Sequence, residues 1–126
     1  MKKKILLNLS GHPAPRGAEK AFDKVVTVPV PTVDLGRAEA IKEAAQSLVK
    51  QALEDAELKE ALRRGEAAVI LPGASVLAGT VLAVLEGFSG TLPKLFWAVR
   101  TEGGFTLSEG LDLSELRLAG RSLREG

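Results

Sequence analysis

The sequence predicts an α/β domain in which helices pack on a mainly parallel sheet. The chain has 126 residues, close to the usual size of one domain. Hydrophobic residues make up 45% and charged residues 26%, an ordinary globular balance. Segments rich in β-branched residues alternate with segments whose apolar residues recur at helical spacing, as in α/β proteins. We therefore expect residues 1–126 to form one domain, a three-layer sandwich around the sheet.

The first half of the chain predicts two strands and two helices. Ile5–Leu9 is an apolar run that predicts a buried strand, because it is too short for the hydrophobic region of an export signal. Without such a signal we expect the protein in the cytoplasm. Lys24–Val30 is β-branched and bounded by prolines, which predicts a second strand. Asp34 is the expected N-cap of a helix running to about Asp55, and Glu57–Arg64 predicts a shorter helix.

The uncharged stretch Ala67–Leu85 allows two interpretations. Its length approaches that of a transmembrane helix. The pair Pro72–Gly73 interrupts it, however, which favours a strand, a tight turn and a helix. We expect the strand over Ala67–Leu71 and the helix over Ala74–Glu86, ending at Gly87, and no membrane span.

The last part of the chain predicts a fourth strand, an edge strand and a helix. Lys94–Arg100 is the expected strand, with Trp97 in the core. Phe105–Leu107 follows a Gly-Gly turn and is expected to pair with it as an antiparallel edge strand. Leu113–Glu125 predicts an amphipathic helix.

Composition excludes several classes of site. The chain has no cysteine and one histidine, so thiolate chemistry and a histidine-cluster metal centre are excluded within one chain. No dinucleotide fingerprint, P-loop or nucleophile-elbow motif is present. The net charge of +1 does not favour non-specific binding of DNA. We expect no metal and no cofactor, and an anion would need a local site.

Three loops should lie where a parallel sheet binds its ligands, outside the carboxyl ends of the strands. They are Ser10–Gly17, Pro72–Ser75 and Arg100–Gly104. The candidate ligand-binding residues in and beside these loops are Asn8, Ser10, Gly11, His12, Arg16, Pro72, Gly73, Ala74, Ser75 and Arg100.

Each candidate has a chemical reason and a plainer alternative. Gly73 lets a ligand approach the backbone at a helix N-terminus, and Ser75 adds a hydroxyl donor. Arg16 could form two hydrogen bonds to a phosphate, and Asn8 could contact a base edge or a ribose. Taken singly, loop Ser and Asn residues more often stabilise turns or cap helices. A histidine before a proline, such as His12, is more often an ordinary loop residue.

The predicted helix after Pro72–Gly73 is apolar on every side. A helix that covers one sheet in a small domain normally has a polar stripe. We therefore expect a second surface to cover it, and a two-fold homodimer would place two copies of the ligand loops side by side. The alternative is an interior helix packed by the C-terminal helix of the same chain.

The segments ILLNLSGHPAP, VVTVPV, AAVILPGASVLAGTVLAVLEG and LFWAVR together resemble a known family. The chain is similar to the small CRISPR-associated Csx-fifteen proteins of type III systems, in which a first strand runs into Asn-x-Ser-His-Pro. Asn8, Ser10, His12 and Pro13 match this motif, with Gly11 as an extra residue. The Pro-Gly turn and the apolar helix match the middle segment of the family.

This resemblance implies a Rossmann-like fold akin to the CARF domains that bind cyclic oligoadenylates. It implies cyclic tetra-adenylate as the ligand and a role in lowering the level of this messenger in type III CRISPR immunity. A ring of four nucleotides with two-fold symmetry suits the two-fold homodimer expected above, with a larger ligand-bridged assembly as an extension.

The resemblance leaves two mechanisms open, sequestration and cleavage. A ring nuclease would use a ribose 2′-hydroxyl as nucleophile and needs no metal, only in-line positioning and stabilisation of charge. His12 or Arg16 would serve as its catalytic residues. The loops offer little acid–base chemistry otherwise, so we favour sequestration. A third alternative is a protein-interaction module without a nucleotide ligand.

Overall fold

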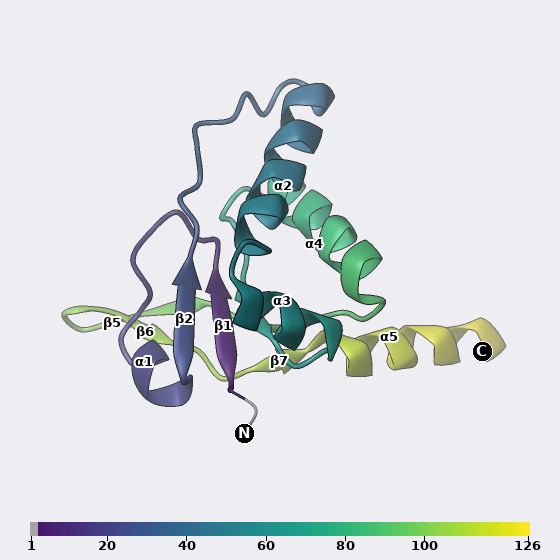
Figure 1. Cartoon of the computed structure of the whole chain (residues 1–126). Coiled ribbons are helices and arrows are strands. Elements are labelled where there is room, and N and C mark those ends of the chain that lie inside the picture. Colours follow the sequence, from purple (N-terminus) through teal and green to yellow (C-terminus); the bar gives the residue numbers. More distant parts are fainter. Residues whose placement is uncertain (1–2) are drawn as a thin grey trace.

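The computed structural model describes residues 3–126 as an α/β fold with two sheets (Figure 1). The larger sheet has the order β2-β1-β3-β4-β7; its first four strands are parallel, and β7 is antiparallel to β4. Strands β5 and β6 form a separate antiparallel pair. In chain order the elements are β1 (Ile5–Asn8), α1 (Ala18–Ala21), β2 (Lys24–Thr27), α2 (Ala38–Ala52), α3 (Ala56–Arg63), β3 (Ala68–Ile70), α4 (Ser75–Ser89), β4 (Lys94–Phe96), β5 (Ala98–Thr101), β6 (Gly104–Leu107), β7 (Leu111–Asp112), α5 (Leu113–Ser122) and a 3₁₀ turn (Leu123–Glu125).

Strand β1 lies between β2 and β3, and all four of its residues are buried. Leu7 is paired with Val26 on one side and with Val69 on the other. Because side chains alternate along a strand, Ile5 and Leu7 face one layer of the protein and Leu6 faces the other. A strand buried on both faces needs a continuous apolar sequence, which explains the run that begins the chain.

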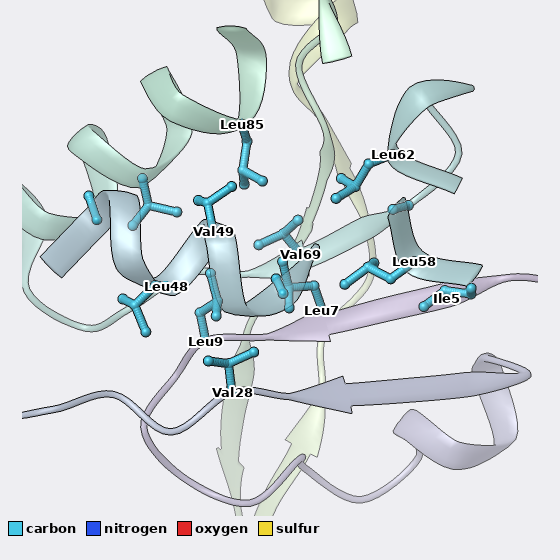
Figure 2. Packing of buried hydrophobic residues seen from close by; sticks show 14 of the residues in the cluster. Ile5, Leu7, Leu9, Val28, Leu48, Val49, Leu58, Leu62, Val69 and Leu85 are labelled. Atoms are coloured by element: carbon cyan, nitrogen blue, oxygen red, sulfur yellow. The ribbon is translucent and has the colours of Figure 1, made fainter. Parts of the chain in front are cut away.

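One face of the sheet, here called the helical face, is covered by α2, α3 and α4 (Figure 1). Its core contains leucine and valine side chains from these helices and from β1 and β3 (Figure 2). The residues labelled there are Ile5, Leu7, Leu9, Val28, Leu48, Val49, Leu58, Leu62, Val69 and Leu85.

The opposite face, here called the α1 face, has a smaller core. Leu6, Ala68 and Ile70 point to it from the sheet, and Ala18 of the four-residue helix α1 packs against them. The rings of Phe22 and Phe96 meet edge to face, with centroids 5.2 Å apart. The coverage of the two faces is therefore unequal.

The expected helix cap at Asp34 is wrong. Helix α2 begins at Ala38, and its N-cap position is Arg37. The Asp34 carboxylate instead accepts a hydrogen bond from the Gly36 N–H at 3.0 Å and closes a turn. Aspartate stabilises either arrangement through the same local hydrogen bond, so the residue type alone does not distinguish a cap from a turn.

Helix α4 is longer than predicted. Gly87 lies inside it, and Gly90, with a φ of 76°, ends it in the left-handed conformation that glycine favours. The buried side of α4, formed by Leu77, Val81 and Leu85, belongs to the helical-face core, to which α2 also contributes. The alternative in which the C-terminal helix packs on α4 is therefore wrong, because α2 packs there instead.

The predicted fourth strand is divided at Trp97. Lys94–Phe96 joins the main sheet as β4, whereas Ala98–Thr101 forms the separate ribbon with β6. The antiparallel pairing of Phe105–Leu107 is therefore present, but the edge strand of the main sheet is β7, which the sequence did not predict. Trp97 is 44% exposed, so its expected place in the core is wrong.

The C-terminal helix α5 extends away from the rest of the fold (Figure 1). None of its residues is buried. Across residues 3–126, no helix combines the length and the apolar character needed to cross a membrane, in agreement with the strand–turn–helix interpretation of Ala67–Leu85.

An ionic cluster joins β2 to the start of α3. The Lys24 ammonium lies 2.7 Å from the Asp55 carboxylate and 2.9 Å from Glu57. Asp55 also caps α3 by accepting the Leu58 N–H at 3.0 Å. The hydrogen bond from Lys24, followed by the one from Leu58, lowers the pKa of Asp55 below its ordinary value.

Shortening a buried side chain of the central strand β1 should destabilise the protein strongly. Leu7→Ala removes a fully buried side chain between two strands and in the core of the helical face, so it should cost about 2–5 kcal/mol of unfolding free energy. Leu35→Ala, at a half-exposed position, should change it by about 0.5 kcal/mol or less. Urea denaturation of the two variants checks this, and equal losses would contradict the burial of β1.

Asp55 should make the protein less stable in acid. Its folded-state pKa is lowered, so its contribution is complete above the ordinary pKa of 3.8 and is lost as the pH falls through the folded-state pKa. Asp55→Asn keeps a capping side chain and should flatten this loss, whereas Asp55→Ala should also cost about 1 kcal/mol at neutral pH. Thermal melts from pH 7 to pH 2 measure both effects. Parallel pH curves for wild type and Asp55→Asn would disprove the role of the charge.

Candidate ligand pocket at the carboxyl edge of the sheet

The buried amide of Asn8 organises the loop that follows β1. Its Nδ2 donates to the His12 carbonyl at 2.8 Å and to the Thr27 hydroxyl at 3.3 Å. Its Oδ1 accepts from the backbone N–H of Ser10 at 3.1 Å and from the Ser10 hydroxyl at 2.7 Å. Both donors and both acceptor positions of the amide are therefore used inside the protein. Asn8 is fully buried and holds the loop in place from behind.

The loop turns sharply between Ser10 and His12. The Ser10 hydroxyl accepts the backbone N–H of His12 at 3.1 Å. Gly11 has a φ of 83°, a conformation that residues with a Cβ rarely adopt. Gly11 is thus the residue that lets the His12 carbonyl turn back to Asn8.

The same loop is joined to the β5–β6 ribbon through Arg16. The Arg16 N–H donates to the Phe105 carbonyl at 3.2 Å, and the Leu107 N–H donates to the Arg16 carbonyl at 2.8 Å. The Arg16 guanidinium also donates to the Thr101 hydroxyl at 3.2 Å. A guanidinium has five N–H donors, so these contacts leave others free to reach an anion. Arg16 is exposed and has no carboxylate partner within residues 3–126.

A pocket of about 560 Å³ lies between the loop and the ribbon. Its volume is within the range of small-molecule sites, roughly 300–1,000 Å³. The walls are mostly apolar, and the two cationic or titratable side chains in the lining are His12 and Arg16. The lining consists of Ser10, His12, Pro13, Ala14, Pro15, Arg16, Ile70, Ala98, Gly103, Gly104 and Phe105.

The pocket lies at the point where the strand order of the sheet reverses. From β1 the chain connects to β2 on one side, whereas β3 lies on the other side. The carboxyl ends of two such strands flank the crevice in which open α/β sheets bind ligands. Asn8 ends β1 and Ile70 ends β3, and these two residues are direct neighbours in the sheet. The topology therefore favours this edge.

The structure brings together some of the predicted site residues. Ser10, His12 and Arg16 line the pocket, with Gly11 in the turn between them and Asn8 buried behind. The turn Pro72–Ser75 and Arg100 are not in the lining of this pocket, and their contact with a ligand stays a prediction.

Three apolar residues of the lining lie outside the predicted ligand loops. Phe105 and Ala98 come from the ribbon, and Ile70 comes from the end of β3. Ile70 could have been proposed because it ends a strand at the predicted ligand edge. The Gly-Gly turn did predict the two strands of the ribbon. The position of the ribbon against the first loop was not predictable, because it depends on the tertiary hydrogen bonds of Arg16.

Comparison with known proteins yields no match among family models, curated proteins or solved structures. Within residues 3–126, no group of three or more His, Cys, Asp or Glu side chains is arranged to hold a metal ion.

The Asn8 network should be sensitive to charge. Asn8→Asp is nearly isosteric but replaces two donors with acceptors and places a carboxylate against the His12 carbonyl. We expect a loss of about 2–3 kcal/mol in unfolding free energy, measured by urea denaturation. Ser10→Ala, in the same network but partly exposed, should cost about 1 kcal/mol. A neutral effect of Asn8→Asp would mean that the loop is not held from behind by this amide.

Proposed function

We propose that this protein binds cyclic tetra-adenylate and lowers its free concentration by sequestration, damping type III CRISPR signalling. The observation that carries the proposal is the pocket at the carboxyl ends of β1 and β3, which combines apolar walls with His12 and Arg16. Three of the four motif residues, Ser10, His12 and Pro13, line this pocket, and the fourth, Asn8, is buried behind it.

The lining suits one part of a nucleotide ring. Phe105, Ile70 and Pro13 offer flat or apolar surface for an adenine, and aromatic stacking contributes to binding of bases of any sequence. Arg16 and His12 would receive a phosphate. The exposed turn at Gly73 and Ser75 leads into α4, whose first-turn N–H groups have no side-chain cap. In our proposal it supplies a second phosphate contact at the same edge of the sheet.

The proposal includes a Rossmann-like, CARF-like fold and a homodimer. A strand order of 2-1-3-4 with parallel strands is compatible with such a fold. A ring of four nucleotides is larger than one pocket, so two copies would share it about its two-fold axis. The exposed side of α4, formed by Val76, Gly79, Ala83 and Gly87, is the surface we propose for this dimer. Such a protein would act in the cytoplasm, without a metal or cofactor.

Sequestration is favoured over cleavage by the chemistry of the pocket. The lining contains no carboxylate, and His12 is its one imidazole, so the pocket offers few groups for general acid–base catalysis. In-line attack by a ribose hydroxyl still needs little more than positioning and charge stabilisation, which His12 and Arg16 could provide. The ring nuclease is therefore the second candidate, and product analysis separates the two.

Removal of Arg16 should weaken ligand binding. A charge-assisted hydrogen bond contributes about 1.5–3 kcal/mol, so Arg16→Ala should raise the Kd for cyclic tetra-adenylate about 10–100-fold in calorimetric titration. Arg37→Ala, at the start of α2, is the matched control and should bind like wild type. Arg100→Ala tests whether the ring extends along the ribbon.

Chromatography of the same mixtures decides between binding and turnover. Retained, intact ligand supports sequestration. Linear product that disappears in His12→Ala or Arg16→Ala supports the nuclease instead. If wild type neither retains nor cleaves the ring, the proposed function is wrong and a protein-interaction module replaces it.

A further inference from the structure

Few polar side chains at the pocket are free to recognise a nucleobase. Asn8, behind the lining, uses both donors and both acceptor positions of its amide inside the protein. The Ser10 hydroxyl donates to the Asn8 Oδ1 at 2.7 Å and accepts the His12 N–H at 3.1 Å. The proposed function assigns His12 and Arg16 to a phosphate. A base in this pocket would therefore be recognised by main-chain groups.

Successive residues along β6 direct their main-chain groups to opposite sides. The Phe105 carbonyl and the Leu107 N–H bond to the main chain of Arg16, at 3.2 Å and 2.8 Å. Both residues therefore face away from β5, because the N–H and C=O of one strand residue point to the same side. Ser108, which follows β6, donates its N–H to the Trp97 carbonyl at 2.9 Å, on the β5 side. Main-chain bonds to β5 thus come from the even-numbered residues.

The register of the ribbon transfers this alternation to β5. Val99 pairs with Thr106, so the N–H and C=O of Val99 point to β6. Ala98 pairs with Leu107, so the N–H and C=O of Ala98 point to the outer edge of β5. Within residues 3–126, no other segment bonds to these two groups. Every residue of β5 is exposed, so this edge is open.

We propose that Ala98 recognises adenine through this free edge, with its N–H donating to the ring nitrogen N1 and its C=O accepting from the N6 amino group. Of the residues of β5, Ala98 is the one that lines the pocket. Adenine presents an acceptor beside a donor on its Watson–Crick edge, which complements the N–H and C=O of one strand residue. This recognition rests on the part of the proposed function that places an adenine nucleotide in the pocket.

The edge of β5 would add selectivity that the apolar walls lack. Phe105 and Ile70 offer apolar surface, and stacking accepts any base because every base has a π-face. Hypoxanthine differs from adenine at the recognised edge, where it has a carbonyl oxygen in place of the amino group and an N–H in place of N1. Its donor and acceptor are exchanged, so each Ala98 group would face a group of its own kind.

Paired nucleotides that differ at this edge test the recognition by Ala98. Titration calorimetry compares AMP with IMP, and cyclic tetra-adenylate with cyclic tetra-inosinate, which has the same ring and the same phosphates. We expect each inosine form to bind about 10-fold or more weakly than its adenine form, because two hydrogen bonds are lost.

A proline at position 98 tests the N–H itself. Proline is tolerated at a free strand edge, so Ala98→Pro should melt close to wild type, whereas Val99→Pro removes a bond to β6 and should melt lower. Ala98→Pro should narrow the difference between AMP and IMP to about threefold or less. Equal weakening of both nucleotides would overturn the proposal, because Ala98 would then only shape the pocket. If Ala98→Pro does not fold, the nucleotide pairs on wild type decide.

The outcomes separate base recognition from the proposed function. If the two rings bind equally well, the ring is a ligand but Ala98 does not recognise its bases, and the proposal is wrong. If neither ring binds but AMP binds more tightly than IMP, base recognition stands and the proposed function is wrong. If neither the rings nor the mononucleotides bind, both are wrong.

Discussion

The buried amide of Asn8 connects the sheet to the pocket more directly than any other group we describe. It bridges β1 to Thr27 at the end of β2 and to the His12 carbonyl in the following loop. An amide suits this position because it donates and accepts at once, whereas burial would penalise a charged group. The loop in turn carries His12 and Arg16 to the pocket, and Arg16 fixes the ribbon that forms the other wall. The shape of the site thus depends on one uncharged side chain.

Unequal coverage of the sheet is the second constraint. The helical face is closed by three helices, whereas the α1 face relies on one helical turn and a few aromatic contacts. Within residues 3–126, seven of the nine exposed large hydrophobic residues lie between Trp97 and Leu123: Trp97 stands at the break after β4, and the other six lie in the ribbon, β7, α5 and the 3₁₀ turn. Apolar surface concentrated in this way usually marks a place of contact with another molecule. The buried hydrophobic residues therefore lie before Trp97, whereas most of the exposed large hydrophobic side chains lie from Trp97 onward.

Local sequence patterns predicted the four parallel strands and helices α2 to α4. A strand buried on both faces is a continuous apolar run, as in Ile5–Asn8, and a helix buried on one side has apolar residues at helical spacing, as in Leu77–Leu85. Asp34 was mistaken for a cap because a turn uses the same bond. The pairing of the ribbon strands was predicted, but its separation from the main sheet was not, because the break at Trp97 depends on Ser108, whose hydroxyl accepts the Trp97 N–H at 2.9 Å. Strand β7 was not predicted at all. Of the pocket, the loop residues were predictable; Phe105 and Ala98 were not, since Arg16 brings them there through tertiary contacts.

The hydrogen bond between Arg16 and Phe105 spans 89 positions of the chain. Contacts of such separation close a large loop and carry a high entropic cost until the intervening structure has formed. During synthesis the first wall of the pocket emerges long before the second, so a nascent chain has its central strand but no pocket. The site is completed only when almost the whole protein has been made. A chain that ends before Gly103 would therefore lack part of one wall of the pocket, whereas residues after Phe105 do not line it.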